Sequence, residues 1–110
     1  MKEVKKPWGT EKHFIINKKC TVKILHISPN EILSLQKHKK REEEWYFLTE
    51  GYIQVENKKF KVKKNSFITI PRKKLHRLFA KNKNVEVLEI CTGKFDKNDE
   101  IRLEDKYGRK

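Results

Sequence analysis

Short runs in which apolar and polar residues alternate recur along the chain, and a polar turn ends each run. Alternation places every second side chain on one face of an extended strand, whereas a helix needs a repeat of about 3.6 residues. No long helix is predicted, although a short helical turn is expected around residues 99–103. Short strands at this spacing are typical of a sandwich or barrel, so the sequence predicts an all-β fold of about nine strands. The predicted strands are residues 11–16, 20–27, 32–38, 43–49, 52–56, 59–63, 67–70, 75–80 and 85–91.

The length of 110 residues suits one domain, and we expect residues 1–110 to form it. No apolar run approaches the ~20 residues that a membrane-spanning helix needs, and the charged residues 1–6 lack the apolar segment of a secretory signal. Cys20 and Cys91 stand apart in strand-like runs, which favours buried, reduced thiols over a disulfide. These features predict a cytoplasmic protein without membrane association.

The formal net charge is +13, and such a charge attracts polyanions. Five of the 28 basic residues are arginines, and the others are lysines scattered along the whole chain. Bidentate recognition of phosphates and bases favours arginine, whereas scattered lysines are typical of a solvated surface. We therefore expect no specific nucleic-acid partner, and only weak, salt-sensitive binding.

One set of side chains predicts a metal site. Gln36 and His38 share a face of their predicted strand, and Glu43 lies on the next strand, on the face opposite Glu44. His76 opens a later strand after a proline and a short loop. Two imidazoles, a carboxylate and an amide oxygen suit a divalent ion such as Zn²⁺, Fe²⁺, Mn²⁺ or Ni²⁺.

The same residues resemble the two characteristic motifs of the cupin superfamily. In the first motif, the places of Gly, His-x-His and Glu are taken by Asn30, Gln36, His38 and Glu43; in the second, Asn65, Pro71, Lys73, His76 and Ala80 fall on motif positions. Asn replaces both motif glycines and tolerates positive φ, so both turns are expected to form. The resemblance implies a single cupin barrel, which is a double-stranded β-helix or jelly roll.

More narrowly, the chain resembles the cupin domain of type II mannose-6-phosphate isomerases, which is also found at the C-terminus of bifunctional mannose-1-phosphate guanylyltransferases. The start and the end of the chain make this match specific, through Pro7-Trp8-Gly9 and the segment from Arg102 to Arg109. The matching stretches are residues 6–9, 33–38, Arg41 with Glu43 and Trp45, residues 70–71 with 76–78, and residues 101–109.

The chain also departs from this family. Lys39 and Lys40 replace two histidines of a cluster that follows the Gln, and a protonated lysine has no lone pair for a metal. Two alignments of the acidic ligand disagree, because counting forward from Gln36 favours Glu43 and counting back from Gly51 favours Glu44. We expect Glu43, since its ungapped match is longer.

The resemblance implies an isomerase that interconverts mannose 6-phosphate and fructose 6-phosphate with one divalent metal ion. Glu44 and Glu104 are the candidate catalytic bases, and Arg77, Arg102 and Arg109 are the candidates for binding the sugar phosphate. A non-catalytic metal-cupin that binds a sugar or nucleotide-sugar is the alternative. The resemblance further implies a homodimer, and no guanylyl transfer because the nucleotidyltransferase domain is absent from this sequence.

Overall fold

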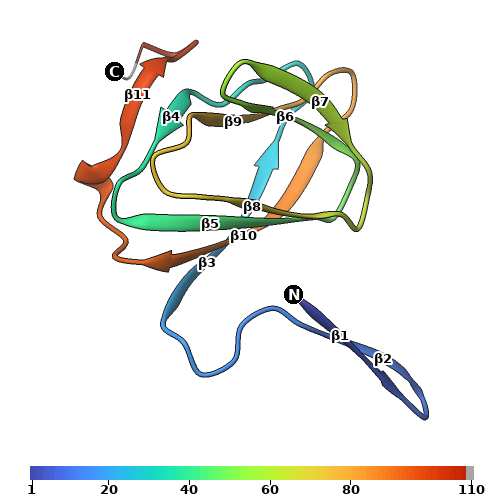
Figure 1. The fold of residues 1–110 in the computed structure, drawn as a ribbon. Helices are drawn as coiled ribbons and strands as arrows, with labels where there is room; N and C mark the ends of the chain where they lie inside the picture. The colour runs from blue at the N-terminus through green and yellow to red at the C-terminus, as the bar shows by residue number, and fades with distance from the viewer. Residues whose placement is uncertain (109–110) are drawn as a thin grey trace.

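A computed structural model describes residues 1–108, and it consists of strands apart from one short 3₁₀ turn, η1 (Lys97–Asp99) (Figure 1). The all-β prediction is therefore confirmed. The strands are β1 (Lys2–Lys6), β2 (Gly9–His13), β3 (Cys20–Ile27), β4 (Leu35–Lys37), β5 (Arg41–Phe47), β6 (Gly51–Val55), β7 (Lys58–Val62), β8 (Phe67–Ile70), β9 (His76–Phe79), β10 (Val85–Gly93) and β11 (Ile101–Glu104).

Two antiparallel sheets form a jelly-roll sandwich. Four strands pair in the order β3-β10-β5-β8, and five pair in the order β11-β4-β9-β6-β7. Apolar side chains from both sheets meet between them and form one core. The core residues are Ile27, Trp45, Phe47, Ile53, Val62, Ile70, Leu78, Ala80, Val85 and Val87.

Alternation along β5 links this core to the functional residues. Trp45 and Phe47 are fully buried in the core, and Glu43 and Arg41 point inward on the same face. The core therefore fills one end of the sandwich, whereas polar side chains fill the other. Strand alternation alone places the carboxylate of Glu43 inside the protein.

Two asparagines occupy turns that require positive φ. Asn30 has φ 64° and Asn65 has φ 68°, which is the left-handed region that asparagine tolerates better than most residues. Both turns form without the glycines of the cupin motifs, as the sequence predicted.

The structure corrects three details of the predicted strands. A hairpin, β1 and β2, replaces the strand predicted at residues 11–16, and β4 covers only part of the strand predicted at 32–38. The first half of that predicted strand forms only an isolated bridge, between Ile32 and Phe79. In the tail, the helical turn expected around residues 99–103 lies earlier, as η1, and residues 101–104 form strand β11. Within residues 1–108, no helix is long and apolar enough to cross a membrane.

Candidate metal centre

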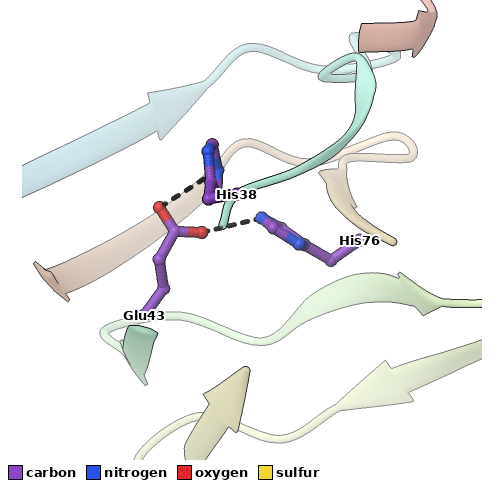
Figure 2. A group of neighbouring side chains, drawn as sticks. All are labelled: His38, Glu43 and His76. Carbon is purple, nitrogen blue, oxygen red and sulfur yellow. Dashed lines mark ion pairs between the residues drawn. The ribbon is translucent and has the colours of Figure 1, made fainter. Parts of the chain in front are cut away.

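His38, Glu43 and His76 form a buried cluster inside the sandwich, with the carboxylate of Glu43 between the two rings (Figure 2). His38 directly follows β4, Glu43 belongs to β5, and His76 begins β9. His76 Nε2 lies 2.7 Å from Glu43 Oε1, and His38 Nε2 lies 3.7 Å from Glu43 Oε2. One possible ligand atom from each residue lies within 4.8 Å of the others, so the three can surround one small cation.

The ring of His76 is oriented by the backbone. Its Nδ1 lies 2.8 Å from the carbonyl oxygen of Lys74, and because a carbonyl only accepts, Nδ1 donates. Ligating histidines commonly make such a bond with the nitrogen that does not bind the metal. Nε2 then faces a carboxylate oxygen at 2.7 Å, and among the described residues it has no hydrogen bond of normal geometry. The buried Nε2 and the carboxylate oxygen thus face each other as donor atoms without a hydrogen bond between them, and such a donor set fits a divalent metal ion that both could ligate.

Arg41 packs against the same cluster. Its guanidinium donates from Nη2 to His38 Nε2 at 3.3 Å, and its Nε lies 3.5 Å from Glu43 Oε2. Because a guanidinium only donates, Nε2 of His38 accepts and carries a lone pair. Arg41 thus contacts the lone pair that His38 would offer to a metal ion, so binding of a metal by Nε2 of His38 would require the Arg41 guanidinium to move aside.

Burial and charge set the ionisation of the cluster. Burial lowers the pKa of His38 to about 4, because the imidazolium loses its hydration. Burial alone would raise the pKa of Glu43, but the contact with His76 and the charges of His38 and Arg41 outweigh it and lower this pKa to about 2. At neutral pH, His38 is therefore neutral and Glu43 is a carboxylate.

Gln36, the fourth expected ligand, lies next to the cluster. It pairs with His76 across β4 and β9, and its half-buried side chain lines the same cavity as Glu43 and His76. Glu44 points to the opposite face of β5, where the strand register places it beside the buried Ile90. The structure thus places Glu43, and not Glu44, among the possible metal ligands.

Lys39 and Lys40 lie outside the cluster. Both side chains are exposed, and both backbone N–H groups donate to the carboxylate of Asp99, at 3.2 Å and 2.8 Å. Neither lysine therefore belongs to the cluster of His38, Glu43 and His76, and the Lys40 ammonium is paired with Asp96.

Sequence reasoning missed Glu89, a buried carboxylate on β10. Its Oε2 accepts from Trp45 Nε1 at 3.1 Å, and the thiol of Cys91 lies 3.5 Å from its Oε1. Burial, together with the negative charge of Glu43, raises the pKa of Glu89 to about 7. Burial also raises the pKa of the Cys91 thiol, which stays protonated. The sequence does contain a sign of this carboxylate. Every second residue of the apolar strand faces inward, and these residues are Val85, Val87, Glu89 and Cys91.

Two connected hollows adjoin the cluster. The first, which we call the barrel cavity, has a volume of about 120 Å³, and its wall includes Gln36, Glu43, His76, Arg77 and Glu89. The second, the basic pocket, has a volume of about 400 Å³ and is lined by Lys23, Arg41, Phe95, Lys97, Glu100 and Arg102. Lys23, Arg41 and Glu100 line both hollows, so the basic pocket adjoins the barrel cavity.

The remaining predicted site residues are dispersed. Arg77 lines the barrel cavity and donates from Nη2 to Glu104 at 2.8 Å. Arg102 lines the basic pocket and forms an ion pair with Glu100. Glu104 is an exposed residue of β11 and lines neither hollow. The prediction for Arg109 lies outside the described residues.

Both cysteines are free. Cys91 is buried beside Glu89, as expected for an inward strand position, whereas Cys20 is exposed at the start of β3. The expectation of two buried thiols is therefore wrong for Cys20, because the chain that enters β3 leaves its outer face open.

Comparison with known proteins places this site in a family. The family model described as "Mannose-6-phosphate isomerase C-terminal" matches residues 1–105. The alginate biosynthesis protein AlgA of Pseudomonas aeruginosa is 36% identical over 97% of this chain, and the mannose-1-phosphate guanylyltransferase ManC of Salmonella typhimurium is 29% identical over 98%. The chain spans 23% of the length of each of these relatives.

The fold comparison agrees with the sequence comparison. A solved cupin-2 domain from Rhodospirillum rubrum superposes with a TM-score of 0.69 and 18% identity, over 84% of this chain and 62% of that one. This likeness supports the cupin jelly roll that the motifs predicted. With nearly its whole length matched by the family model, the chain belongs to the mannose-6-phosphate isomerase C-terminal family of cupins.

Proposed function

We propose that this chain is a metal-dependent isomerase that interconverts mannose 6-phosphate and fructose 6-phosphate. The observation that carries the proposal is the His38–Glu43–His76 cluster, buried beside a cavity that adjoins a basic pocket. The family's name and the mannose phosphate chemistry named in ManC support the choice of sugar. Gln36 completes the proposed ligand set for one divalent ion.

The reaction needs a group that moves a proton between C1 and C2 of the sugar. When bound, the metal ion would act as a Lewis acid that polarises the carbonyl and hydroxyl oxygens of the substrate. Among the described residues, the carboxylates on the cavity wall are Glu43, Glu89 and Glu100, and Glu100 is paired with Arg102. We therefore favour Glu89 as the proton acceptor over Glu44 and Glu104, whose side chains lie away from the cavity.

The basic pocket is the proposed site for the phosphate group. Lys23, Lys97 and Arg102 bring three cations to the pocket that adjoins the barrel cavity, and a phosphate there would leave the sugar carbons pointing inward. Phe95 supports this pocket, because Lys23 Nζ lies 4.2 Å from its ring centroid. In this proposal the positive charge of the chain serves a phosphorylated sugar and solubility, and not a specific nucleic acid.

A coupled assay tests the activity directly. The protein is stripped with a chelator, reloaded separately with Zn²⁺, Mn²⁺, Fe²⁺ or Ni²⁺, and mixed with mannose 6-phosphate. The proposal predicts formation of fructose 6-phosphate that depends on the metal and is lost in His76→Ala. Absence of turnover with every metal, in protein shown to contain the metal, would refute the isomerase.

One observation favours the second candidate, a non-catalytic metal-cupin that binds a sugar or nucleotide-sugar. The guanidinium of Arg41 lies against His38 and Glu43 and would take part of the space in which a substrate oxygen has to approach the metal, which hinders turnover more than binding. Calorimetry with mannose 6-phosphate and with GDP-mannose separates the two candidates. Metal-dependent binding without turnover would support the non-catalytic protein.

A further inference from the structure

β10 carries a cysteine and a carboxylate on its inward face, next to Glu43. The strand register sets Cys91 directly opposite Glu43 of β5, and Glu89 lies two residues earlier on the same face of β10. The exposed fractions are 1% for Cys91, 3% for Glu43 and 6% for Glu89. One possible ligand atom from each of the three lies within 4.8 Å of the others, so they form a second buried cluster that shares Glu43 with the first.

The thiol of Cys91 contacts both carboxyl groups. Its Sγ lies 3.6 Å from Oε2 of Glu43 and 3.5 Å from Oε1 of Glu89. A thiol has one proton and is a weak donor, so it can donate to only one of these oxygens at a time. A cysteine that serves packing alone is expected among apolar side chains. The partners of Cys91 are instead oxygen atoms of the kind that ligate cations.

A nitrogen atom without a partner also points at Glu43. Nε2 of His76 lies 2.7 Å from Oε1 of Glu43, its side chain is 3% exposed, and it has no hydrogen bond within residues 1–108. Buried polar atoms nearly always have a partner, so this ring nitrogen, directed at a carboxylate, indicates that a cation belongs on Glu43. The chemistry of the cation then decides which neighbours of Glu43 complete its coordination.

The two sets of ligands around Glu43 differ in chemistry. His38 and His76 offer imidazole nitrogens, whereas Cys91 and Glu89 offer a sulfur atom and a second carboxylate. Imidazole suits borderline ions, and thiolate selects soft ones. Arg41 contacts Nε2 of His38, but in the described part of the chain it makes no hydrogen bond or ion pair with Cys91 or Glu89. A cation at the thiol therefore leaves the contact between Arg41 and His38 in place.

We propose that Glu43, Glu89 and Cys91 form a second cation site, which binds a soft, thiophilic ion such as Cd²⁺. On binding, a bond forms between the metal and Sγ, the S–H bond of Cys91 breaks, and the proton leaves to solvent, because a coordinating thiol is deprotonated. Two carboxylates and one thiolate around a dication leave one negative charge. The guanidinium of Arg41, whose Nε lies 3.5 Å from Glu43, offsets that charge.

The barrel cavity gives the ion a route to this site. Glu43 and Glu89 both line the cavity, so an ion that enters it meets the two carboxylates first. The histidine position and the thiol position share the carboxylate of Glu43, and two dications this close together beside Arg41 would repel each other strongly. The chain therefore holds one ion at a time. The inference does not rest on the proposed isomerase activity, because it concerns only which ions these side chains bind.

Ultraviolet spectroscopy tests the site, with Cd²⁺ alone as the probe. Cadmium bound to a thiolate gives a charge-transfer band that carboxylate and imidazole ligands do not give. Metal-free Cys20→Ser protein should develop this band and saturate at one Cd²⁺ per chain, whereas Cys91→Ser should not develop it. Cys20→Ser leaves Cys91 as the only cysteine of the chain, so its band can come from no other residue, even where Cys91→Ser fails to fold.

The second carboxylate is tested in the Cys20→Ser background. Glu89→Gln should weaken Cd²⁺ binding at least tenfold, measured by titration of the band, and should leave the affinity for Mn²⁺ nearly unchanged, because Mn²⁺ disfavours thiolate. Glu86→Gln, a carboxylate on the opposite face of β10, is the matched control and should change neither affinity. No band in Cys20→Ser, or equal Cd²⁺ affinities in Glu89→Gln and Glu86→Gln, would overturn the inference.

Discussion

Nε2 of His76 lies 2.7 Å from Oε1 of Glu43. Both atoms are hydrogen-bond acceptors when the imidazole ring is neutral and the carboxyl group is ionised. The other ring nitrogen of His76 is already engaged with the carbonyl of Lys74. A proton shared by the two atoms, or a cation that both of them ligate, would relieve this contact. Because a metal ion needs the lone pair of His76 Nε2, protons compete with the metal for this site, which couples the affinity for metal to pH.

Glu43 and its neighbour Glu44 form a natural matched pair for mutation. Glu43→Gln keeps the shape of the side chain and removes the charge from the cluster, so metal affinity should fall by at least tenfold. Glu44→Gln changes a residue on the opposite face of β5 and should leave metal affinity unchanged. Isothermal titration with Zn²⁺ measures both. Equal losses in the two variants, or a loss only in Glu44→Gln, would contradict the assignment of Glu43.

Glu89 should make the stability of the metal-free protein depend on pH. The pKa of Glu89 is raised to about 7 in the folded state, so the native protein holds a proton that the unfolded chain loses near pH 4.5. The free energy of unfolding should therefore fall as the pH rises from about 4.5 to 7, relative to Glu89→Gln, by up to about 3 kcal/mol. Urea denaturation of both proteins at several pH values measures the difference. A difference that stays constant with pH would show that Glu89 titrates normally.

The same variant separates two roles of Glu89 in the proposed reaction. If Glu89 accepts the substrate proton, Glu89→Gln should lower kcat at least a hundredfold and leave the metal content intact. Glu89 also belongs to a second possible metal-binding group, with Glu43 and Cys91. Loss of bound metal in Glu89→Gln would assign it to the ligand set and would rule out the role as base.

Lys23 tests the proposed phosphate site. Lys23→Met keeps much of the side-chain length but removes a cation that lines the basic pocket. The KM for mannose 6-phosphate should rise about tenfold while kcat changes little, because phosphate binding is shared by the ground state and the transition state. Lys58→Met, an exposed lysine of β7, is the control. Similar KM values in both variants would move the phosphate elsewhere.

Much of the fold could be predicted because it depends on local patterns. The alternation in β5 and β10 fixed which side chains face inward, and asparagine at Asn30 and Asn65 was compatible with the turns. The first hairpin could not be predicted in this way. Its strands are charged on both faces and contain little besides Val4 to bury, so no apolar alternation marks them.

The site was predictable only in part, for a related reason. His38, Glu43 and His76 lie at or near the ends of strands, at positions that the motif spacing marks in the sequence. These three residues meet in the structure. The contact of Arg41 with His38 and the proximity of Glu89 to Glu43 depend on pairing between strands that are far apart in sequence. Side chains joined only by the three-dimensional pairing leave no spacing signal in one sequence.

Metal content tests the central claim most directly. Purified chain is stripped, loaded with a divalent metal, freed of excess metal, and analysed for bound metal per chain. We predict one ion per chain in the wild type, nearly none in His76→Ala, and one in His26→Ala, which removes an exposed imidazole paired with Glu86. A wild-type protein that binds no metal after loading, or a His76→Ala variant that binds as much as the wild type, would contradict the account.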